Sequence, residues 1–275
     1  MPRENEISVE ARLKMAFRPK RWIDRVLRQR AEAQWARLSD STAGLRSGRL
    51  AYLRDEAAML RRNLDRFLMQ SDHRLAISRA GLDNIALPGG TDWRWRPEFL
   101  STPGRPSGVA APENAARMGD SVTIWHDCPH RALMLRQVQN VRATDLASHG
   151  LRVEVMGFAG DFLSMSIDLP QAALEGLTRN HIIRLDSAVE VERGQDIYFR
   201  LNIGNGPNTE ELLRHLGGVT PGQVCQNVTE FDLALTQMNE RRLDKIWLDV
   251  IFERPQMNAV TIREMILSRH PRAQV

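Results

Sequence analysis

DIYFRLNI, residues 196–203, and IWLDVIFE, residues 246–253, decide the fold class of this chain. Each stretch places apolar side chains at alternate positions: Ile197, Phe199, Leu201 and Ile203 in the first, and Ile246, Leu248, Val250 and Phe252 in the second. Successive side chains of a strand point to opposite faces of a sheet. Each stretch therefore predicts a β-strand with one buried face.

The same period of two recurs along residues 121–275. Further predicted strands are SVTIWH (121–126), ALMLRQV (132–138), LRVEVMG (151–157), FLSMSIDL (162–169), HIIRLDSAVEVE (181–192), EFDLALTQ (230–237) and VTIREMIL (260–267). Turn signals such as SHG, ERGQD, GNGPN and ERPQMN separate many of them. Short strands without long intervening helices favour an antiparallel jelly-roll-like β-sandwich over a parallel α/β fold.

Two inserted stretches predict short helical turns between strands, LPQAALEGL (169–177) and NTEELLRHL (208–216). In the second, Asn208 can cap a short helix while Glu211 reaches back in the manner of a capping box. The polar GNGPN loop before it can bind a sugar hydroxyl or an ion, or it can satisfy its own backbone. The loop ERPQMN (253–258) leaves the same alternatives open.

The first 120 residues have a different character. Residues 1–75 predict a basic helical segment, with helices at about 20–39 and 47–72 joined by the Ser- and Gly-containing connection SDSTAGLRSG. Leu50, Leu53, Ala57, Leu60, Leu64 and Phe67 alternate steps of three and four, the spacing of a coiled-coil seam. Residues 76–120 are rich in Gly and Pro and predict a strap or linker before the sandwich at 121–275.

Charge is concentrated in the helical segment. Residues 1–80 hold 18 Lys and Arg against 10 Asp and Glu, whereas the whole chain of 275 residues has a formal net charge of only +4. Such a segment can form a helical hairpin in which the 50–67 seam packs on residues 20–39, or pair with a second copy through the 50–67 helix. It can also lie on an anionic membrane surface or neutralise the phosphates of nucleic acid. Helix pairing is the favoured interpretation and nucleic acid the least favoured.

The composition is that of a water-soluble globular protein, with 42% hydrophobic and 26% charged residues. The N-terminal sequence has no apolar core of a secretory signal, and no apolar run approaches the length of a membrane span. Cys128 and Cys225 are too few for a disulfide framework, so we expect reduced thiols and a cytoplasmic location. Nothing in the sequence calls for a cofactor.

The segment TDWRWRPEF, residues 91–99, supplies the candidate ligand-binding residues Trp93, Arg94, Trp95 and Arg96. Aromatic faces beside guanidinium groups suit the apolar face and hydroxyl rim of a sugar ring. Asn205 and Asn208 in the polar loop complete the candidate set. The alternative, which we favour for the tryptophans, is that they anchor the strap to the sandwich.

A second candidate is TIWHDCPHR, residues 123–131. His126, Cys128 and His130 occupy alternate positions and could face one zinc ion. Pro129 interrupts a regular strand through this set, and no fourth ligand has paired spacing. We therefore expect a strand followed by a turn, and no metal site.

No motif of a serine hydrolase, a zinc protease or a P-loop occurs in the chain. Acidic residues on the predicted strands could form a carboxylate pair of the glycosidase kind, but such residues also stand on solvated sheet faces. An enzyme is therefore the less favoured class.

The motifs HDCP (126–129), NGPNTE (205–210) after FRLNI, MNE (238–240) and IFERPQMN (251–258) together resemble an uncharacterised bacterial family known only as a domain of unknown function. This resemblance implies no catalytic residues. The strand pattern, closing with VTIREMILSRHPR, is also similar to that of jelly-roll carbohydrate-binding modules.

The leading hypothesis is a non-catalytic binding module for a glycan or glycoconjugate, with helices for assembly or membrane contact. The alternatives are a cytoplasmic carbohydrate-active or metal-dependent enzyme, and a basic scaffold associated with nucleic acid.

Overall fold

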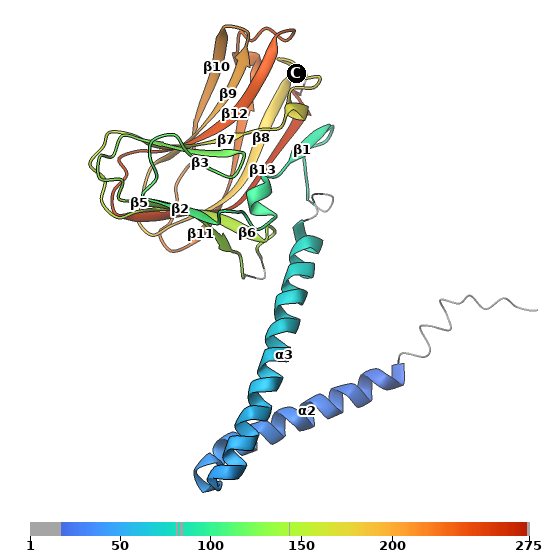
Figure 1. The fold of residues 1–275 in the computed structure, drawn as a ribbon. Coiled ribbons are helices and arrows are strands. Elements are labelled where there is room, and N and C mark those ends of the chain that lie inside the picture. The colour runs from blue at the N-terminus through green and yellow to red at the C-terminus, as the bar shows by residue number, and fades with distance from the viewer. Residues whose placement is uncertain (1–17, 81, 83–84, 143, 274–275) are drawn as a thin grey trace, which may run out of the picture. The chain divides into compact units, whose positions relative to one another are not determined.

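The computed structural model describes residues 18–80, 82, 85–142 and 144–273 (Figure 1). The chain divides into two compact units, residues 1–70 and 71–275, each of which is described by itself. Residues 1–17 of the predicted helical segment lie outside the described residues.

The first unit is helical, as its sequence predicts. Helix α2 covers Arg18–Asp40, the short 3-10 helix η1 covers Thr42–Gly44, and helix α3 begins at Ser47 and ends at Ala80. The boundary at residue 70 falls inside α3, whose 34 residues continue beyond the predicted end at 72. Among the described residues, neither helix combines the length and the apolar character needed to cross a membrane.

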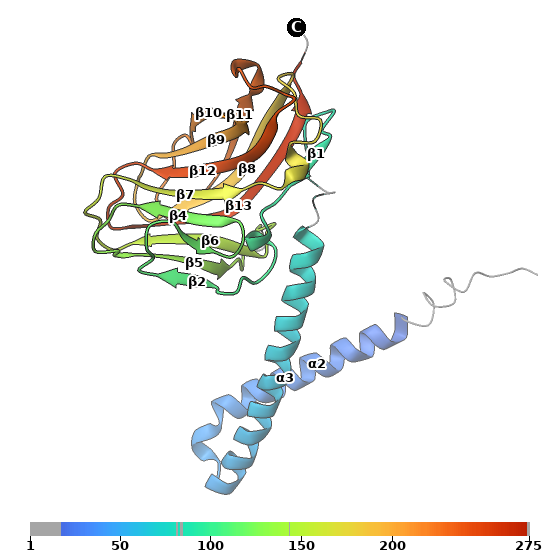
Figure 2. The same ribbon diagram turned by 45° about the horizontal axis from the view of Figure 1, so that its top comes forward.

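The second unit is an antiparallel β-sandwich of two sheets (Figures 1 and 2). The six-stranded sheet has the order β10-β9-β12-β7-β4-β3. Its strands are β3 (Ala116–Met118), β4 (Val122–His126), β7 (Leu163–Asp168), β9 (Ile197–Asn205), β10 (Asn208–His215) and β12 (Leu243–Phe252).

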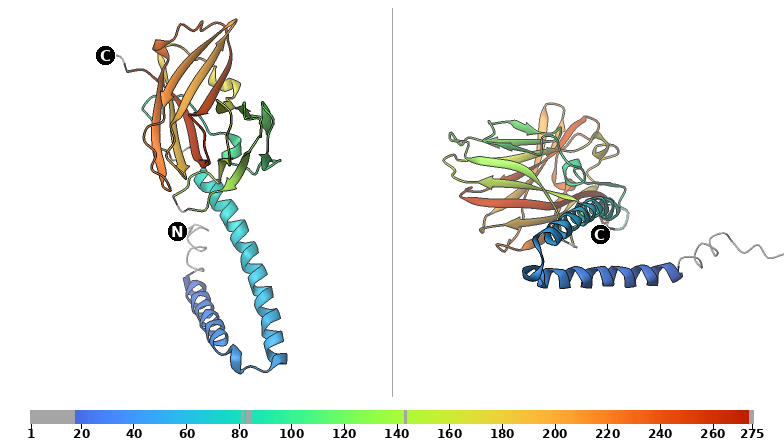
Figure 3. Two further views of the ribbon diagram at one scale, coloured as in Figure 1. Left: turned by 90° about the vertical axis from the view of Figure 1, so that its left-hand side faces the viewer. Right: turned by 60° about the horizontal axis from the view of Figure 1, so that its bottom comes forward.

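The seven-stranded sheet has the order β11-β8-β13-β6-β5-β2, with β1 also paired to β13. Its strands are β1 (Trp93–Trp95), β2 (Gly108–Ala110), β5 (Leu133–Gln139), β6 (His149–Val155), β8 (His181–Val191), β11 (Val224–Asp232) and β13 (Asn258–Pro271). Figure 3 shows the two sheets facing one another.

The apolar core lies between the sheets. The inward side chains of β9, from Ile197 to Ile203, are at most 1% exposed, and those of β12 are at most 3% exposed. In β8 the inward positions from Ile183 to Val191 are buried in the same alternating way. The period of two therefore built the sandwich, and the predicted jelly-roll-like fold class is confirmed.

The Gly- and Pro-rich segment supplies short strands to both sheets. β1 pairs with β13, β2 pairs with β5, and β3 pairs with β4. A 3-10 helix, η3 (Glu98–Leu100), buries Phe99 and Leu100 in the core. The side chain of Gln137 holds the following loop, because its Nε2 donates to the carbonyl of Thr102 at 2.7 Å and its Oε1 accepts from Gly104 N at 2.7 Å. This segment is therefore a strap whose three short strands extend the two sheets.

The predicted helical turn at 208–216 is wrong, and with it the capping role of Asn208 and Glu211. Asn208–His215 is strand β10, which pairs with β9 in a hairpin from Asn208 opposite Asn205. Gly206, at φ +69°, and Pro207 form its two-residue turn. The ladder to the edge of β9 and the burial of Leu212 outweigh the weak local helical signal.

The other predicted helical turn is confirmed as a 3-10 helix, η4 (Gln171–Ala173). The predicted strand at 230–237 ends early. β11 stops at Asp232, whose carboxylate accepts a hydrogen bond from Ala234 N and opens the 3-10 helix η5 (Leu233–Leu235). An aspartate at such a position caps a helix more readily than it continues a strand.

Candidate functional site: the outer face of the six-stranded sheet

The outer faces of the two sheets differ in chemistry. On the seven-stranded sheet, charged side chains of β5, β6, β8 and β13 pair with each other or with charged residues of adjacent loops. The pairs are Arg136–Glu154, Arg152–Glu154, Arg152–Glu192, Arg142–Glu190 and Arg263–Glu190. Hydrogen bonds from Arg136 hold the pKa of Glu154 below its ordinary value despite partial burial. These charges are largely engaged with one another.

The six-stranded sheet instead carries aromatic rings on its outer face. Since Phe199 and Leu201 point into the core, the residues between and beside them on β9 point outward. The register then aligns outward side chains of β12, β7 and β4 with those of β9. We call this surface the polar–aromatic face; it comprises Trp125, Ser166, Asp168, Tyr198, Arg200, Asn202, Trp247 and Asp249.

Its three rings come from three strands. Trp125 on β4 is 40% exposed, and its Nε1 donates a hydrogen bond to Ser166 Oγ at 2.8 Å. Tyr198 on β9 and Trp247 on β12 are half-buried. Trp125 and Tyr198 share one row of the ladder, with Ser164 and Ile251 between them. Three strand spacings therefore separate them, about 14 Å.

Each ring has a fixed neighbour. The Nζ of Lys245 lies 4.9 Å from the centroid of the Trp247 ring, a cation–π contact. The ring of Tyr198 meets that of His215 edge-on, with centroids 4.9 Å apart. A hydrogen bond to Glu253 raises the pKa of the Tyr198 hydroxyl. These contacts orient the rings.

A hydrogen-bonded cluster lies at the centre of the face. Arg200 donates from Nε and Nη2 to Asp249 Oδ2, at 3.0 and 2.8 Å, and Asn202 Nδ2 donates to the same oxygen at 2.9 Å. The Nη1 of Arg200 also reaches Glu211 Oε2 at 3.3 Å. Asp249 is only 5% exposed, so its charge is compensated by Arg200 rather than by solvent. The Oδ1 of Asn202 is buried and accepts no hydrogen bond from the described residues.

Asp168 connects this face to a cavity of about 400 Å³. It is the cross-strand neighbour of Trp247 and makes ion pairs with Lys245, at 3.3 Å, and Arg117, at 3.6 Å. It also lines the cavity, together with Trp95 and Phe99 of the strap. The cavity has both apolar and carboxylate walls.

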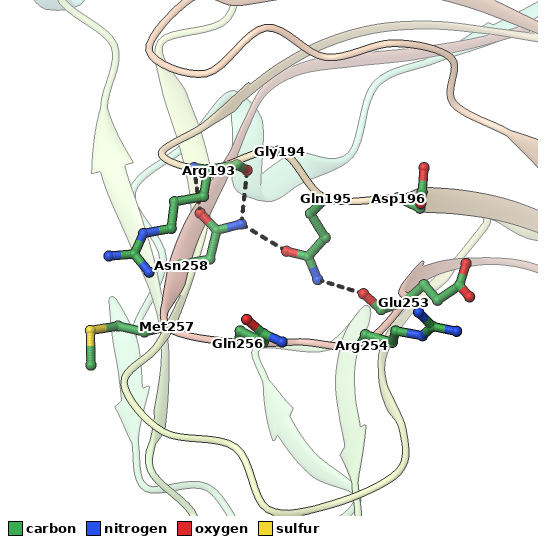
Figure 4. A pocket seen from close by; sticks show the side chains of 9 residues that line it. All are labelled: Arg193, Gly194, Gln195, Asp196, Glu253, Arg254, Gln256, Met257 and Asn258. Carbon is green, nitrogen blue, oxygen red and sulfur yellow. Dashed lines mark hydrogen bonds between the residues drawn. The ribbon is translucent and has the colours of Figure 1, made fainter.

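A second cavity, of about 280 Å³, lies between the β8–β9 loop and the β12–β13 loop (Figure 4). The side chain of Asn258 forms hydrogen bonds that join the two loops. Asn258 Oδ1 accepts from Arg193 N at 2.9 Å, and its Nδ2 donates to Gln195 Oε1 at 2.9 Å, while Gln195 Nε2 donates to the carbonyl of Glu253 at 3.2 Å. The polar groups of these loops therefore hold the two loops together.

The structure separates the six candidate ligand-binding residues of the sequence. Trp93 and Trp95 lie opposite Arg269 and Leu267 of β13, and both rings pack against the core. Arg94 is exposed, whereas Arg96 is buried, with its side chain bonded to Glu264. The two tryptophans therefore pack as anchors of the strap on the sandwich would. Ligand binding at residues 93–96 stays a prediction.

Asn205 and Asn208 flank the β9–β10 turn, and neither lines the cavity to which Trp95 contributes. Asn205 is 4% exposed, and its Oδ1 lies 3.4 Å from Asn239 N, which donates to it. Asn208 is exposed at the start of β10. They do not join the four strap residues in one site.

The candidate zinc ligands also have separate surroundings. His126 is buried at the end of β4; its Nδ1 accepts from Cys128 N at 3.2 Å, and its Nε2 lies 3.1 Å from the carbonyl of Pro112. Cys128 is a buried free thiol, whereas His130 is exposed. Asp127 between them accepts hydrogen bonds from Asp161 N and Phe162 N, which hold its pKa below its ordinary value. Within the described residues, no group of His, Cys, Asp and Glu is arranged to hold a metal ion.

The candidate ligand-binding residues drawn from the sequence do not include Trp125, Trp247 and Tyr198. The signal for their exposure was present, because each stands one position from a buried apolar residue in a strand of period two. What the sequence lacked was the order of the strands, which brings β4, β12 and β9 into one sheet.

The fold and this face define a class: a β-sandwich protein with one outer sheet face of aromatic rings around a polar cluster. Within this class, the chain belongs to the family of unknown function DUF6478, whose model matches residues 15–275. This membership confirms the resemblance found in the sequence. No curated protein matches the chain in sequence.

Solved structures with similar folds include the enzymatically active domain of tailspike protein 4 from bacteriophage CBA120. It is 5% identical, with a TM-score of 0.40, over 56% of this chain and 21% of that one. The chain thus spans about a fifth of that protein's length. The C-terminal family 22 carbohydrate-binding module of Clostridium thermocellum Xyn10B is 12% identical, with a TM-score of 0.39, over 69% and 99% of the two chains. The family 11 module from Clostridium thermocellum, in complex with a mixed-linked tetrasaccharide, is 9% identical, with a TM-score of 0.37, over 56% and 92%.

Proposed function

We propose that this protein is a non-catalytic glycan-binding module and that its ligand lies on the polar–aromatic face. The observation that carries the proposal is the placement of Trp125, Tyr198 and Trp247 at outward positions of one sheet, around the Arg200–Asp249 pair.

The rings supply the apolar part of recognition. A pyranose ring has one apolar face, and a Trp or Tyr ring presents a flat surface that can cover it. Rings about 14 Å apart on a rigid sheet can contact different residues of one oligosaccharide. A β-sheet also holds these rings in place before the ligand arrives, which lowers the entropic cost of binding.

The central cluster supplies the polar part. Arg200 and Glu211 are the accessible polar groups of the cluster, and they present donors and a carboxylate acceptor for the hydroxyl groups at a sugar's rim. Asp249 and Asn202 are buried beneath them, and Asp249 holds the Arg200 guanidinium in position. The carboxylates are held as charge partners: Asp249 by Arg200, and Asp168 by Lys245 and Arg117. Such fixed partners suit the orientation of hydrogen bonds, which is the task of a binding module.

A glycan array with the full chain, followed by calorimetry on the glycan that binds, tests the proposal. We expect Trp125→Ala and Trp247→Ala each to weaken binding about tenfold, which corresponds to about 1.4 kcal/mol. Asp249→Asn should weaken binding as well, because it removes the charge that holds Arg200 in position.

Tyr52→Ala is the matched control, since Tyr52 is an exposed aromatic residue of α3 outside the face. It should bind the glycan as the unmodified protein does, and thermal melts should show that all variants remain folded. A protein that binds no glycan on the array, or that binds equally well without Trp125 and Trp247, would refute the proposal.

A further inference from the structure

We infer that α3 forms a parallel, in-register, two-stranded coiled coil with α3 of a second copy of this chain. The contact surface is the seam of Leu50, Leu53, Ala57, Leu60, Leu64 and Phe67. This inference is independent of the proposed glycan site, because it concerns only residues of the helical unit.

The seam is apolar and continuous, and most of it is exposed within its unit. Leu50 is 38% exposed, Leu60 41%, Leu64 52% and Phe67 66%, while Leu53 and Ala57 are half-buried. Exposed apolar residues scattered singly are ordinary, but these lie on one stripe of a single helix. The stripe follows the alternating three- and four-residue steps of a coiled coil.

The width of the stripe favours a helical partner. At 100° per residue, the six seam positions fall within about 100° of the helix circumference, the narrow seam of a two-helix contact. A helix that lies on a membrane has a wider apolar face with cations along its polar face. Here Asp55 and Glu56 interrupt the cations of that face.

The flanking charges select a second copy in parallel orientation. When Leu50, Ala57 and Leu64 occupy position a of the heptad, Arg54 and Arg61 fall at position e, and Glu56 falls at position g. In a parallel pair, position g faces position e of the next heptad of the partner helix. Glu56 therefore faces Arg61 of the second copy, and the twofold symmetry makes this pair twice.

The opposite orientation lacks this complementarity. An antiparallel pair would place e beside e and g beside g, so that Arg54 and Arg61 would meet like charges. The parallel pair has one unfavourable contact, between Arg49 at position g and Arg54 of the other copy. This contact makes a specific variant informative: Arg49→Glu should strengthen the dimer.

Sedimentation of the full chain at micromolar concentration tests the assembly. We expect a dimer that Leu60→Asp converts to a monomer, because a buried charge at position d is costly. Met59→Asp is the matched control: Met59 is the residue directly before Leu60 and is 56% exposed, but it lies outside the seam. It should leave the dimer intact. Thermal melts of both variants should show an unchanged sandwich.

Two further variants test the orientation. Glu56→Arg should weaken the dimer, and Glu56→Arg combined with Arg61→Glu should restore it, since the swap re-creates the pair only in the parallel arrangement. Ala57→Cys at position a should form an intermolecular disulfide on oxidation, whereas Ala58→Cys on the adjacent flank should not.

A wild-type protein that sediments as a monomer overturns the inference, as does a dimer that Leu60→Asp leaves unchanged. Binding to vesicles that contain phosphatidylserine tests the alternative that the seam contacts an anionic membrane surface. A monomer that binds these vesicles, and loses binding in Leu60→Asp, would assign the seam to a membrane surface and overturn the dimer.

Discussion

Arg96 and Glu264 form a two-point ion pair across 168 residues of chain. The Nε of Arg96 donates to Oε1 at 2.8 Å, and Nη2 donates to Oε2 at 2.7 Å. The two side chains are 3% and 10% exposed, so the pair is almost entirely removed from solvent. It ties the strap, just after β1, to β13 of the seven-stranded sheet.

We expect Arg96→Ala to lower the free energy of unfolding by about 3–5 kcal/mol, because it leaves a buried carboxylate without its partner. Arg94→Ala, two residues away and exposed, should cost less than about 1 kcal/mol. Urea unfolding measures both. The double variant Arg96→Met, Glu264→Leu should be more stable than Arg96→Ala alone; equal stability of all three variants would contradict a buried pair.

Trp95→Ala should destabilise the sandwich, because its ring packs against the core from the strap. A large aromatic residue truncated in a core costs about 3–5 kcal/mol, and the half-buried Trp95 should lie near the lower end of that range. Thermal melts of Trp95→Ala and of Trp125→Ala measure the difference, with a much smaller loss expected for the exposed Trp125. A Trp95→Ala variant with an unchanged melting temperature but no glycan binding would show that residues 93–96 form the ligand site instead.

Asp92 makes the stability of the strap depend on pH. A hydrogen bond from Arg269 lowers the pKa of Asp92 below its ordinary value of 3.8. Because the folded pKa is depressed, the stabilisation is fully present above the unfolded pKa and is lost as pH falls through the folded pKa.

Asp92→Asn should therefore be less stable than the wild type at neutral pH, and the difference should shrink as the pH falls below about 4. Unfolding in urea across this pH range measures it. A difference that stays constant down to the lowest pH would show that Asp92 contributes through its shape rather than through its charge.

Purified protein should contain no stoichiometric zinc at His126, Cys128 and His130. His126 already bonds Cys128 N and lies near the carbonyl of Pro112, and its ring would have to break these contacts to bind a metal. Elemental analysis is the measurement. Near-stoichiometric zinc that disappears in Cys128→Ser would prove the prediction wrong.

The candidate site could be predicted from the sequence only in part. The alternation around Tyr198 and Trp247 fixed which face of each strand these rings occupy, since the parity of a strand is a local property. Their assignment to one surface required the pairing of β4, β7, β12 and β9, which joins residues 37 to 89 positions apart. The sequence of one strand carries no pattern that identifies the distant strand to which it is hydrogen-bonded.

The sequence by itself determined the elements and their faces. Steps of three and four marked α3, and a period of two marked strands such as β9 and β12, because burial of one side of an element imposes its own repeat. The tertiary structure decided what those elements meet. It made β10 a strand, since β9 offered an unpaired edge and a place for Leu212. It also buried Arg96 and exposed Trp125, because the partner of a side chain depends on which distant strand lies beside it.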